Sequence, residues 1–190
     1  MFLGGLPVLR LAGLVSVGAA LTLAVSMAAD YRRARLLSFL HPDSDPLNTG
    51  YQTFQSLVGI AGGGWMGVGP GASRAKWGFL PYAHTDFIYT VIAEEMGFVG
   101  AVTVLMLFIG LAFFGIRAAL KCDDKFGSLL AIGISMWFLL QAFINVGTVI
   151  GVLPVTGIPL PFVSFGGTSL LVGMAAVGII LNVDRQGHNE

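Results

Sequence analysis

The sequence predicts an all-α polytopic membrane protein with about five transmembrane helices and a re-entrant outer loop rich in proline and glycine. Hydrophobic residues make up 55% of the 190 residues and charged residues only 11%, and the mean hydropathy is +0.83. A soluble domain carries roughly a quarter charged residues. The stretches 11–29, 96–116 and 126–183 contain no charged side chain at all. Since a membrane-spanning helix needs about 20 apolar residues, these stretches indicate a membrane protein.

The expected spans follow from the apolar stretches and the breaks between them. We expect the five helices to cover residues 8–29, 51–68, 87–116, 126–148 and 168–183. A polar connector with a Pro/Asp turn signal at 41–46 follows the first span. The second span is rich in glycine, which permits close helix packing or an unwound end. Between the last two spans, residues 151–161 contain too many prolines to remain helical, so we expect a re-entrant loop there.

The basic residues predict the orientation, because cytoplasmic loops carry an excess of lysine and arginine. With five spans, seven basic residues fall on one side: Arg32, Arg33, Arg35, Arg117, Lys121, Lys125 and Arg185. Three fall on the other: Arg10, Arg74 and Lys76. The C-terminus is therefore expected in the cytoplasm and the N-terminus outside. An outside N-terminus without an export signal suggests that further spans precede this chain, and we expect residues 1–190 alone to lack activity.

Other features of the sequence narrow the class of protein. The formal net charge is +0, which gives no sign of a nucleic-acid partner. The single cysteine, Cys122, cannot form an intramolecular disulfide. We find no internal repeat and no soluble domain, and we treat residues 1–190 as a single transmembrane region.

The outer loop before the third span carries the first candidate residues. Asp86 is the one carboxylate in the outward-facing loops, and Arg74, Lys76 and His84 near it suit an anionic ligand such as a phosphate. Asp86 could act as a general base, or it could cap the third helix, and the two roles can coexist. Arg74 and Lys76 could equally extend along the membrane interface to reach headgroups.

Further polar residues lie within the expected spans. Glu94 would lie about 12 Å along the helix from Asp86, where an acid is costly and a functional role is the default hypothesis. Glu94 and Glu95 should face different directions, since successive helix positions differ by about 100°. One would line a cavity or both would only hydrogen-bond. Gln141 and Asn145 share a helix face, where interhelical hydrogen bonds compete with ligand contact.

A segment rich in small and hydroxyl residues opens the last helix. It comprises Ser164, Phe165, Gly166, Gly167, Thr168 and Ser169. Such a helix N-terminus could bind an anion, or Thr168 or Ser169 could be an ordinary N-cap.

Together these motifs resemble the SEDS family (shape, elongation, division and sporulation), whose members include FtsW, RodA and SpoVE. The resemblance rests on motifs in a fixed order along most of the chain. They are Tyr51-Gln52, Gln55-Ser56, the glycine run 62–71, Ser73, Lys76, Leu80-Pro81, His84-Thr85-Asp86-Phe87-Ile88, Glu94-Glu95-Met96-Gly97, Gln141, Asn145, Gly147, Leu153-Pro154, Thr156-Gly157, Leu160-Pro161 and 164–169. The pattern around Lys76-Trp77 and Val155-Thr156-Gly157 is closer to FtsW than to RodA. Two positions depart from the family pattern: Tyr82 stands where an acid is usual, and Phe165 where tyrosine is frequent.

The resemblance implies the last half of a ten-helix bundle and a peptidoglycan glycosyltransferase of the bacterial cytoplasmic membrane. Such an enzyme polymerises lipid II at the outer face during division or elongation, releasing polyprenyl pyrophosphate. The resemblance assigns Asp86 as the catalytic residue. It implies a substrate-binding set of Ser73, Arg74, Lys76, His84, Thr85, Glu94, Gln141, Asn145, Ser164, Gly166, Gly167, Thr168 and Ser169. It leaves open a divalent cation, Mg²⁺ or Mn²⁺, and it implies a class B penicillin-binding transpeptidase and other divisome or elongasome proteins as partners.

Two other functions fit part of the pattern. A flippase or transporter of lipid-linked precursors would explain intramembrane acids and broken helices, but it should have acids accessible from both sides. A non-catalytic scaffold of the division complex would explain the fold without chemistry, and it should tolerate loss of Asp86.

Overall fold

The computed structural model describes residues 8–28, 49–77, 80–81 and 83–187. Within these residues the long elements are all α-helices, with one short 3-10 helix, which confirms the all-α class. The helices are α1 (Val8–Ala28), α3 (Thr49–Gly63), α4 (Ile88–Lys121), α5 (Lys125–Val149) and α6 (Gly167–Gln186), and the 3-10 helix η3 covers Ala75–Trp77. The basic cluster at 32–35, the connector at 41–46 and Tyr82 lie outside the described residues.

Three helices form the membrane-spanning unit. Among the described residues, α4, α5 and α6 are long and apolar enough to cross a bilayer. The apolar stretches that predicted them are local signals, and their observed bounds lie within a few residues of the expected ones, except that α4 extends further, to Lys121. The confirmed class is therefore a polytopic membrane protein, while the count of five spans stays a prediction.

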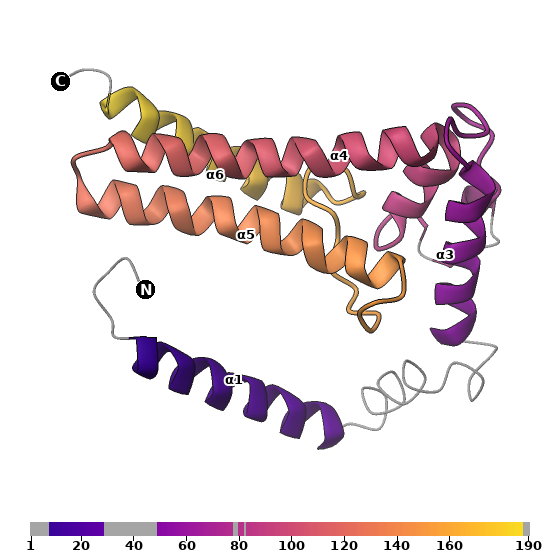
Figure 1. The fold of residues 1–190 in the computed structure, drawn as a ribbon, viewed down its shortest axis with the longest axis horizontal. Coiled ribbons are helices and arrows are strands. Elements are labelled where there is room, and N and C mark those ends of the chain that lie inside the picture. The colour runs from indigo at the N-terminus through magenta and orange to yellow at the C-terminus, as the bar shows by residue number, and fades with distance from the viewer. Residues whose placement is uncertain (1–7, 29–48, 78–79, 82, 188–190) are drawn as a thin grey trace.

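The helices corresponding to the first two expected spans differ from each other. The described side chains of α1 are exposed. Helix α3 has 15 residues, which reach about 22 Å at 1.5 Å per residue, less than the roughly 30 Å of a hydrocarbon core. It ends at Gly63 and not at Val68, because Gly64 takes a positive φ of 54° and starts a loop. In Figure 1, α3 lies across the end of the α4–α5 pair instead of along it.

Helices α4 and α5 form an antiparallel hairpin joined by a tight turn, and α6 packs against both (Figure 1). The carboxylate of Asp124 caps α5 by accepting hydrogen bonds from the backbone N–H groups of Phe126, at 3.3 Å, and Gly127, at 2.7 Å. Caps of this kind satisfy amides that have no partner within the helix. The hairpin thus has one end at residues 121–125 and the other near α3.

A backbone break at Gly97 divides α4. Gly97 has φ 68° and ψ −167°, a conformation that only glycine adopts without strain. There the loop after α3 pairs with α4, main chain to main chain: Val68 N donates to Glu94 O at 3.0 Å, and Phe98 N donates to Gly64 O at 2.8 Å. A Cβ on Gly97 would overlap the backbone of this loop. The glycine run therefore lets the backbone of the loop after α3 pack directly against the backbone at the start of α4.

The main core lies where the loop before α4 and the loop after α5 meet the helices. Its buried side chains include Phe87, Ala142, Val149, Val155 and Leu160. Val155 and Leu160 come from the proline-rich, non-helical segment after α5, and their buried side chains anchor that segment to the core while Thr156 and Gly157 are exposed. Whether this loop re-enters the bilayer stays a prediction.

Candidate active site

Asp86 lies at a junction between the loop before α4 and the loop after α5. Asn145 on α5 donates from Nδ2 to the main-chain oxygen of Asp86 at 2.9 Å and to that of Ile158 at 2.8 Å. Both partners are carbonyl oxygens, which can only accept hydrogen bonds, so the nitrogen of the Asn145 amide must face them. Asn145 is 1% exposed, and one buried side chain therefore ties both loops together.

Ser164 makes a second connection between the same loops. Its hydroxyl donates to the main-chain oxygen of Thr85 at 2.6 Å and accepts from the backbone N–H of Leu160 at 2.7 Å. One residue further on, Phe165 N donates to His84 O at 3.0 Å. The backbone on the N-terminal side of Asp86 is therefore held at three successive residues, 84 to 86. This set of hydrogen bonds fixes the backbone that carries the half-buried side chain of Asp86.

Gly157 lies beside the carboxylate of Asp86. A Cβ built on Gly157 would be 3.5 Å from Asp86 Oδ2, and the glycine has φ +71°. The missing side chain leaves space next to the carboxylate. Sequence reasoning placed Gly157 in the proline-rich loop but not next to Asp86; its position 71 residues away along the chain gave no local signal.

Helix α4 begins at Ile88 with Phe87 as its N-cap residue. Asp86 therefore lies one residue before the cap position, and Phe87 itself makes no side-chain cap hydrogen bond. Whether Asp86 caps the helix as well as acting as a base stays a prediction.

Glu94 lies in a second polar cluster, in the second turn of α4. It is 5% exposed, and its carboxylate accepts three hydrogen bonds: from Ser73 Oγ at 2.5 Å, from Arg74 N at 3.0 Å and from Ala75 N at 3.2 Å. The two backbone donors stand at the start of η3. Ser73 and Glu94, both expected to contact substrate, are thus bonded to each other and hold this turn.

Glu95 joins the same cluster. Its Oε1 forms a salt bridge with Lys76 Nζ at 2.8 Å and accepts from Ser73 N at 3.4 Å. Glu94 and Glu95 are successive helix residues, expected to face different directions, and both carboxylates nevertheless bond to the same segment, residues 73–76. Lys76 is consequently neutralised by Glu95, whereas Arg74 and His84 are exposed.

The residues that open α6 are distributed differently from the expectation. The N-cap is Gly166, without a side-chain hydrogen bond, and the hydroxyl of Ser169 donates to Gly166 O at 2.8 Å. Neither Thr168 nor Ser169 is therefore the N-cap, because extended backbone at Gly166 starts the helix earlier. Gly167, Thr168 and Ser169 are exposed.

Thr168 and Ser169 line a cavity of about 300 Å³ together with Gln141. Gln141 Nε2 donates to Pro159 O at 2.9 Å, which ties this cavity wall to the proline-rich loop. Pro161 also lines a neighbouring apolar cavity of about 200 Å³, with Leu107 and Phe162. These cavities adjoin the loop that is joined to Asp86. Among the described residues no group of three His, Cys, Asp or Glu side chains could hold a metal ion.

One buried connection was not found from the sequence. Ser56 on α3 shares a hydrogen bond with Thr90 on α4 at 2.6 Å and donates to Val149 O of α5 at 2.7 Å. It joins three helices at the loop end of the protein. Its place in the Gln55-Ser56 motif was its only signal.

Comparison with known proteins agrees with this architecture. A model of the FtsW/RodA/SpoVE cell cycle proteins matches residues 1–189. A protein of Thioalkalivibrio sulfidiphilus named probable peptidoglycan glycosyltransferase FtsW is 46% identical over 189 residues, which are 98% of this chain and 47% of the relative. Stage V sporulation protein E of Bacillus subtilis is 43% identical over 185 residues, 97% of this chain and 50% of the relative.

A solved structure shows the same fold. Its subject is the structural coordination of polymerization and crosslinking by a peptidoglycan synthase complex, and one of its chains matches with a TM-score of 0.73 at 34% identity. The match covers 95% of this chain and 49% of the other. The chain thus spans about half the length of the relatives it matches. Because the family model and the solved structure both match nearly the whole length of this chain, it belongs to the FtsW/RodA/SpoVE family.

Proposed function

We propose that this chain contains the catalytic part of a peptidoglycan glycosyltransferase that polymerises lipid II at the outer face of the bacterial cytoplasmic membrane. The observation that carries the proposal is the junction at Asp86. Asn145 and Ser164 hold the backbone of residues 85–86, and Gly157 leaves space beside the carboxylate. Similarity to relatives named probable peptidoglycan glycosyltransferases supports the reaction class.

Asp86 is the proposed general base. It removes the proton of the acceptor sugar's 4-hydroxyl as the hydroxyl oxygen forms a bond to the anomeric carbon of the growing chain. The bond from that carbon to the pyrophosphate oxygen breaks, and polyprenyl pyrophosphate leaves with the bonding electrons. A base held within hydrogen-bond reach of its proton contributes typically 10²–10⁴-fold to the rate.

The exposure and contacts of the other candidate residues suggest a separate role for each. Arg74 and His84 are exposed, so they are the proposed partners of the pyrophosphate, and Lys76 contributes less because Glu95 neutralises it. The cavity at Gln141, Thr168 and Ser169 is a proposed sugar or headgroup subsite, and the apolar cavity at Phe162 a proposed site for part of a polyprenyl tail.

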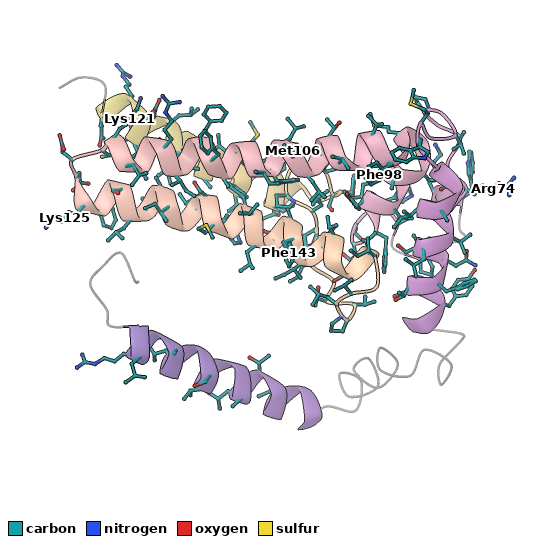
Figure 2. All side chains as sticks on the ribbon, in the orientation of Figure 1. Arg74, Phe98, Met106, Lys121, Lys125 and Phe143 are labelled. Carbon is teal, nitrogen blue, oxygen red and sulfur yellow. The ribbon has the colours of Figure 1, made fainter. Side chains whose placement is uncertain are left out.

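The distribution of charge supports an outward-facing site. Figure 2 has Lys121 and Lys125 at one end of the α4–α5 hairpin and Arg74 near the other, where the loops meet. Arg117 and Arg185 add to the first end. By the positive-inside rule the end with more basic residues faces the cytoplasm, and the Asp86 junction then faces outward. A class B penicillin-binding transpeptidase is the proposed partner, since the matched solved structure concerns polymerization coordinated with crosslinking.

A flippase is the weaker alternative. An acid that binds the cargo of a flippase has to be accessible from both sides of the membrane. Glu94 is instead buried and accepts three hydrogen bonds from one loop turn. This arrangement supports a structural role for Glu94.

A chimera tests the proposed function. Residues 1–189 would replace the matching half of the Thioalkalivibrio relative, and the purified chimera would be incubated with lipid II in detergent. We expect glycan strands on a denaturing gel, and none from the chimera with Asp86→Asn. A chimera that inserts and folds but never polymerises lipid II, or one whose Asp86→Asn variant polymerises normally, would reject the proposal.

A further inference from the structure

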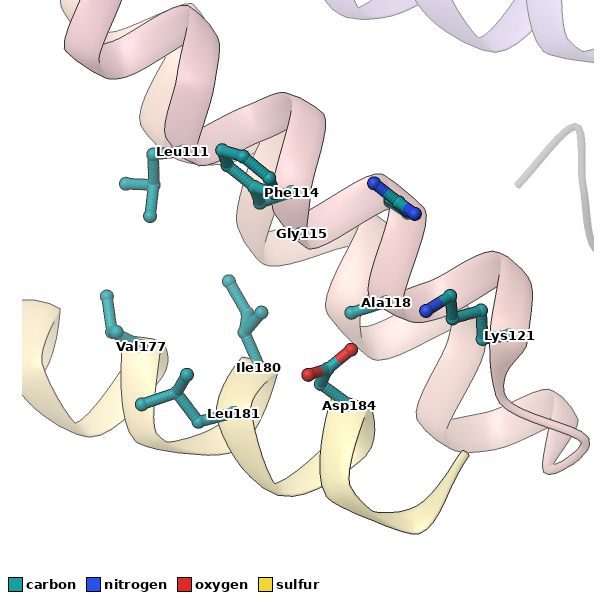
Figure 3. Close-up of a pocket in the computed structure, with 10 residues that line it drawn as sticks. Leu111, Phe114, Gly115, Ala118, Lys121, Val177, Ile180, Leu181 and Asp184 are labelled. Atoms are coloured by element: carbon teal, nitrogen blue, oxygen red, sulfur yellow. The ribbon is translucent and has the colours of Figure 1, made fainter. Parts of the chain in front are cut away.

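A groove between α4 and α6 lies at the basic end of the protein. Its volume is about 300 Å³. The side chains along its length are apolar and come from both helices: Leu111 and Phe114 from α4, Val177, Ile180 and Leu181 from α6. Figure 3 shows Ile180 pointing from α6 toward α4 between these walls. Ala118 and Ile180 are buried and close its base, whereas Phe114 and Leu181 are each 64% exposed and form its rim.

One end of this groove is charged. Arg117 and Lys121 both line it, and since they are four residues apart they share one face of α4. Both are exposed. Asp184 is the one acid among the lining residues, and in Figure 3 it points toward Ala118, at the base. Two cations against one carboxylate leave the mouth positive.

The other charges at this end do not cancel that excess. Lys125 and Arg185 are exposed and add positive charge. The carboxylate of Asp124 accepts two backbone N–H groups at the start of α5, so it is engaged in capping that helix. Asp123, in the turn between α4 and α5, is exposed.

The length of the groove matches one leaflet. From Leu111 to Lys121 the helix rises about 15 Å, which is half of a hydrocarbon core of roughly 30 Å. With the membrane boundary placed at the end of α4, at Lys121, its cations would lie at the headgroup level and Leu111 near the middle of the bilayer. A positive mouth at the interface and an apolar channel one leaflet deep match the two halves of an anionic phospholipid.

We propose that the groove between α4 and α6 is a binding site for an anionic phospholipid. Arg117 and Lys121 bind the phosphate, and one acyl chain lies between Phe114 and Leu181. Basic pockets between transmembrane helices at the cytoplasmic side bind anionic headgroups in this way. The site is at the opposite end of α4 from Asp86, so it does not depend on the proposed reaction.

Lipid retention tests the site. The protein would be placed in nanodiscs of equal phosphatidylglycerol and phosphatidylcholine, then released and weighed by native mass spectrometry. We expect bound phosphatidylglycerol in excess. The double variant Arg117→Gln, Lys121→Gln should lower that preference about 25-fold, fivefold per cation. Lys125→Gln is the matched control, because it removes a cation at the same end that does not line the groove, and it should retain the preference.

A second variant separates the groove from general attraction to a basic surface. Val177→Trp fills the apolar channel and leaves every charge in place, so it should also abolish the preference. Equal retention of the two lipids by the wild-type protein would overturn the proposal. So would an unchanged preference in the double variant or in Val177→Trp. In a Cys122→Ser background, a Leu181→Cys protein that forms disulfide-linked dimers and retains no lipid would show that a protein surface covers the groove, and this outcome would overturn it as well.

Discussion

The side-chain amide of Asn145 on α5 donates a 2.9 Å hydrogen bond to the main-chain carbonyl of Asp86, 59 residues earlier in the chain. The same nitrogen donates to Ile158 O at 2.8 Å. Its amide oxygen is buried and accepts no hydrogen bond from the described part of the protein. Asn145 thus connects two loops, and it keeps one buried acceptor without a partner among the described residues.

Asn145→Leu should therefore destabilise the protein and disorder the junction. It removes the donors from two carbonyls of half-buried residues, and each buried group left unsatisfied costs about 1–3 kcal/mol. Thermal unfolding in detergent should show the loss, and lipid II polymerisation by the chimera should fall with it. Gln141→Leu is the comparison, since it removes one donor from one half-buried carbonyl. A smaller effect at position 145 than at position 141 would contradict the connector role.

Asp86→Asn should separate catalysis from structure. Asparagine keeps the size and one side-chain oxygen of aspartate but cannot accept a proton at neutral pH. We expect an unchanged melting temperature, retained lipid II binding and a polymerisation rate lower by about 10²–10⁴-fold. Asp124→Asn should leave both rate and stability near wild type, because asparagine and aspartate cap helices about equally well. Near-normal polymerisation by Asp86→Asn would favour the scaffold or transporter.

Glu94→Gln should loosen the turn at residues 73–77. Glutamine has one acceptor oxygen where the carboxylate accepts from Ser73, Arg74 and Ala75. We expect the free energy of unfolding to fall by about 1–3 kcal/mol. Hydrogen exchange at the amides of residues 74 and 75 should become faster. Glu95→Gln, which weakens a partly exposed ion pair with Lys76, should cost less, about 0–1 kcal/mol. Unchanged exchange at both amides in Glu94→Gln would show that the carboxylate does not hold the turn.

Gly97→Ala should disrupt the contact between the loop after α3 and α4. Alanine at φ 68° and ψ −167° is strained by about 1–3 kcal/mol, and its Cβ would meet the backbone of Gly67 and Trp65. The expected result is a lower melting temperature and lower yield of folded protein. Gly110→Ala, further along the same helix with no atom within 4 Å of the added Cβ, should be neutral or slightly stabilising. Equal melting temperatures for the two variants would rule out the proposed role of the break.

Cysteine labelling should reveal the orientation. In a Cys122→Ser background, single cysteines at the exposed positions Ala72 and Thr156 should react with an impermeant maleimide added to intact cells. A cysteine at Asp123, in the turn between α4 and α5, should react only after the membrane is permeabilised. The reverse pattern would place Asp86 in the cytoplasm and exclude chemistry at the outer face.

Local signals in the sequence were enough for the class of protein and for three of its helices. Apolar stretches of helical length predicted α4, α5 and α6 within a few residues at most of their ends, since burial in a bilayer depends on the composition of each segment by itself. The ordered motifs likewise predicted the family that the comparisons confirm. Asp86 was singled out because no other acid lies between residues 64 and 93.

Tertiary structure alone decided how those residues meet. Helix α3 ends at Gly63, and Glu94 and Glu95 converge on one turn. Both features depend on backbone pairing between segments about 30 residues apart, and hydrophobic periodicity within a short window cannot predict such pairing. The junction of Asp86, Asn145 and Gly157 joins residues up to 71 positions apart. Hydrogen bonds between side chains and irregular backbone depend on where two loops cross, and that crossing exists only once the helices have packed.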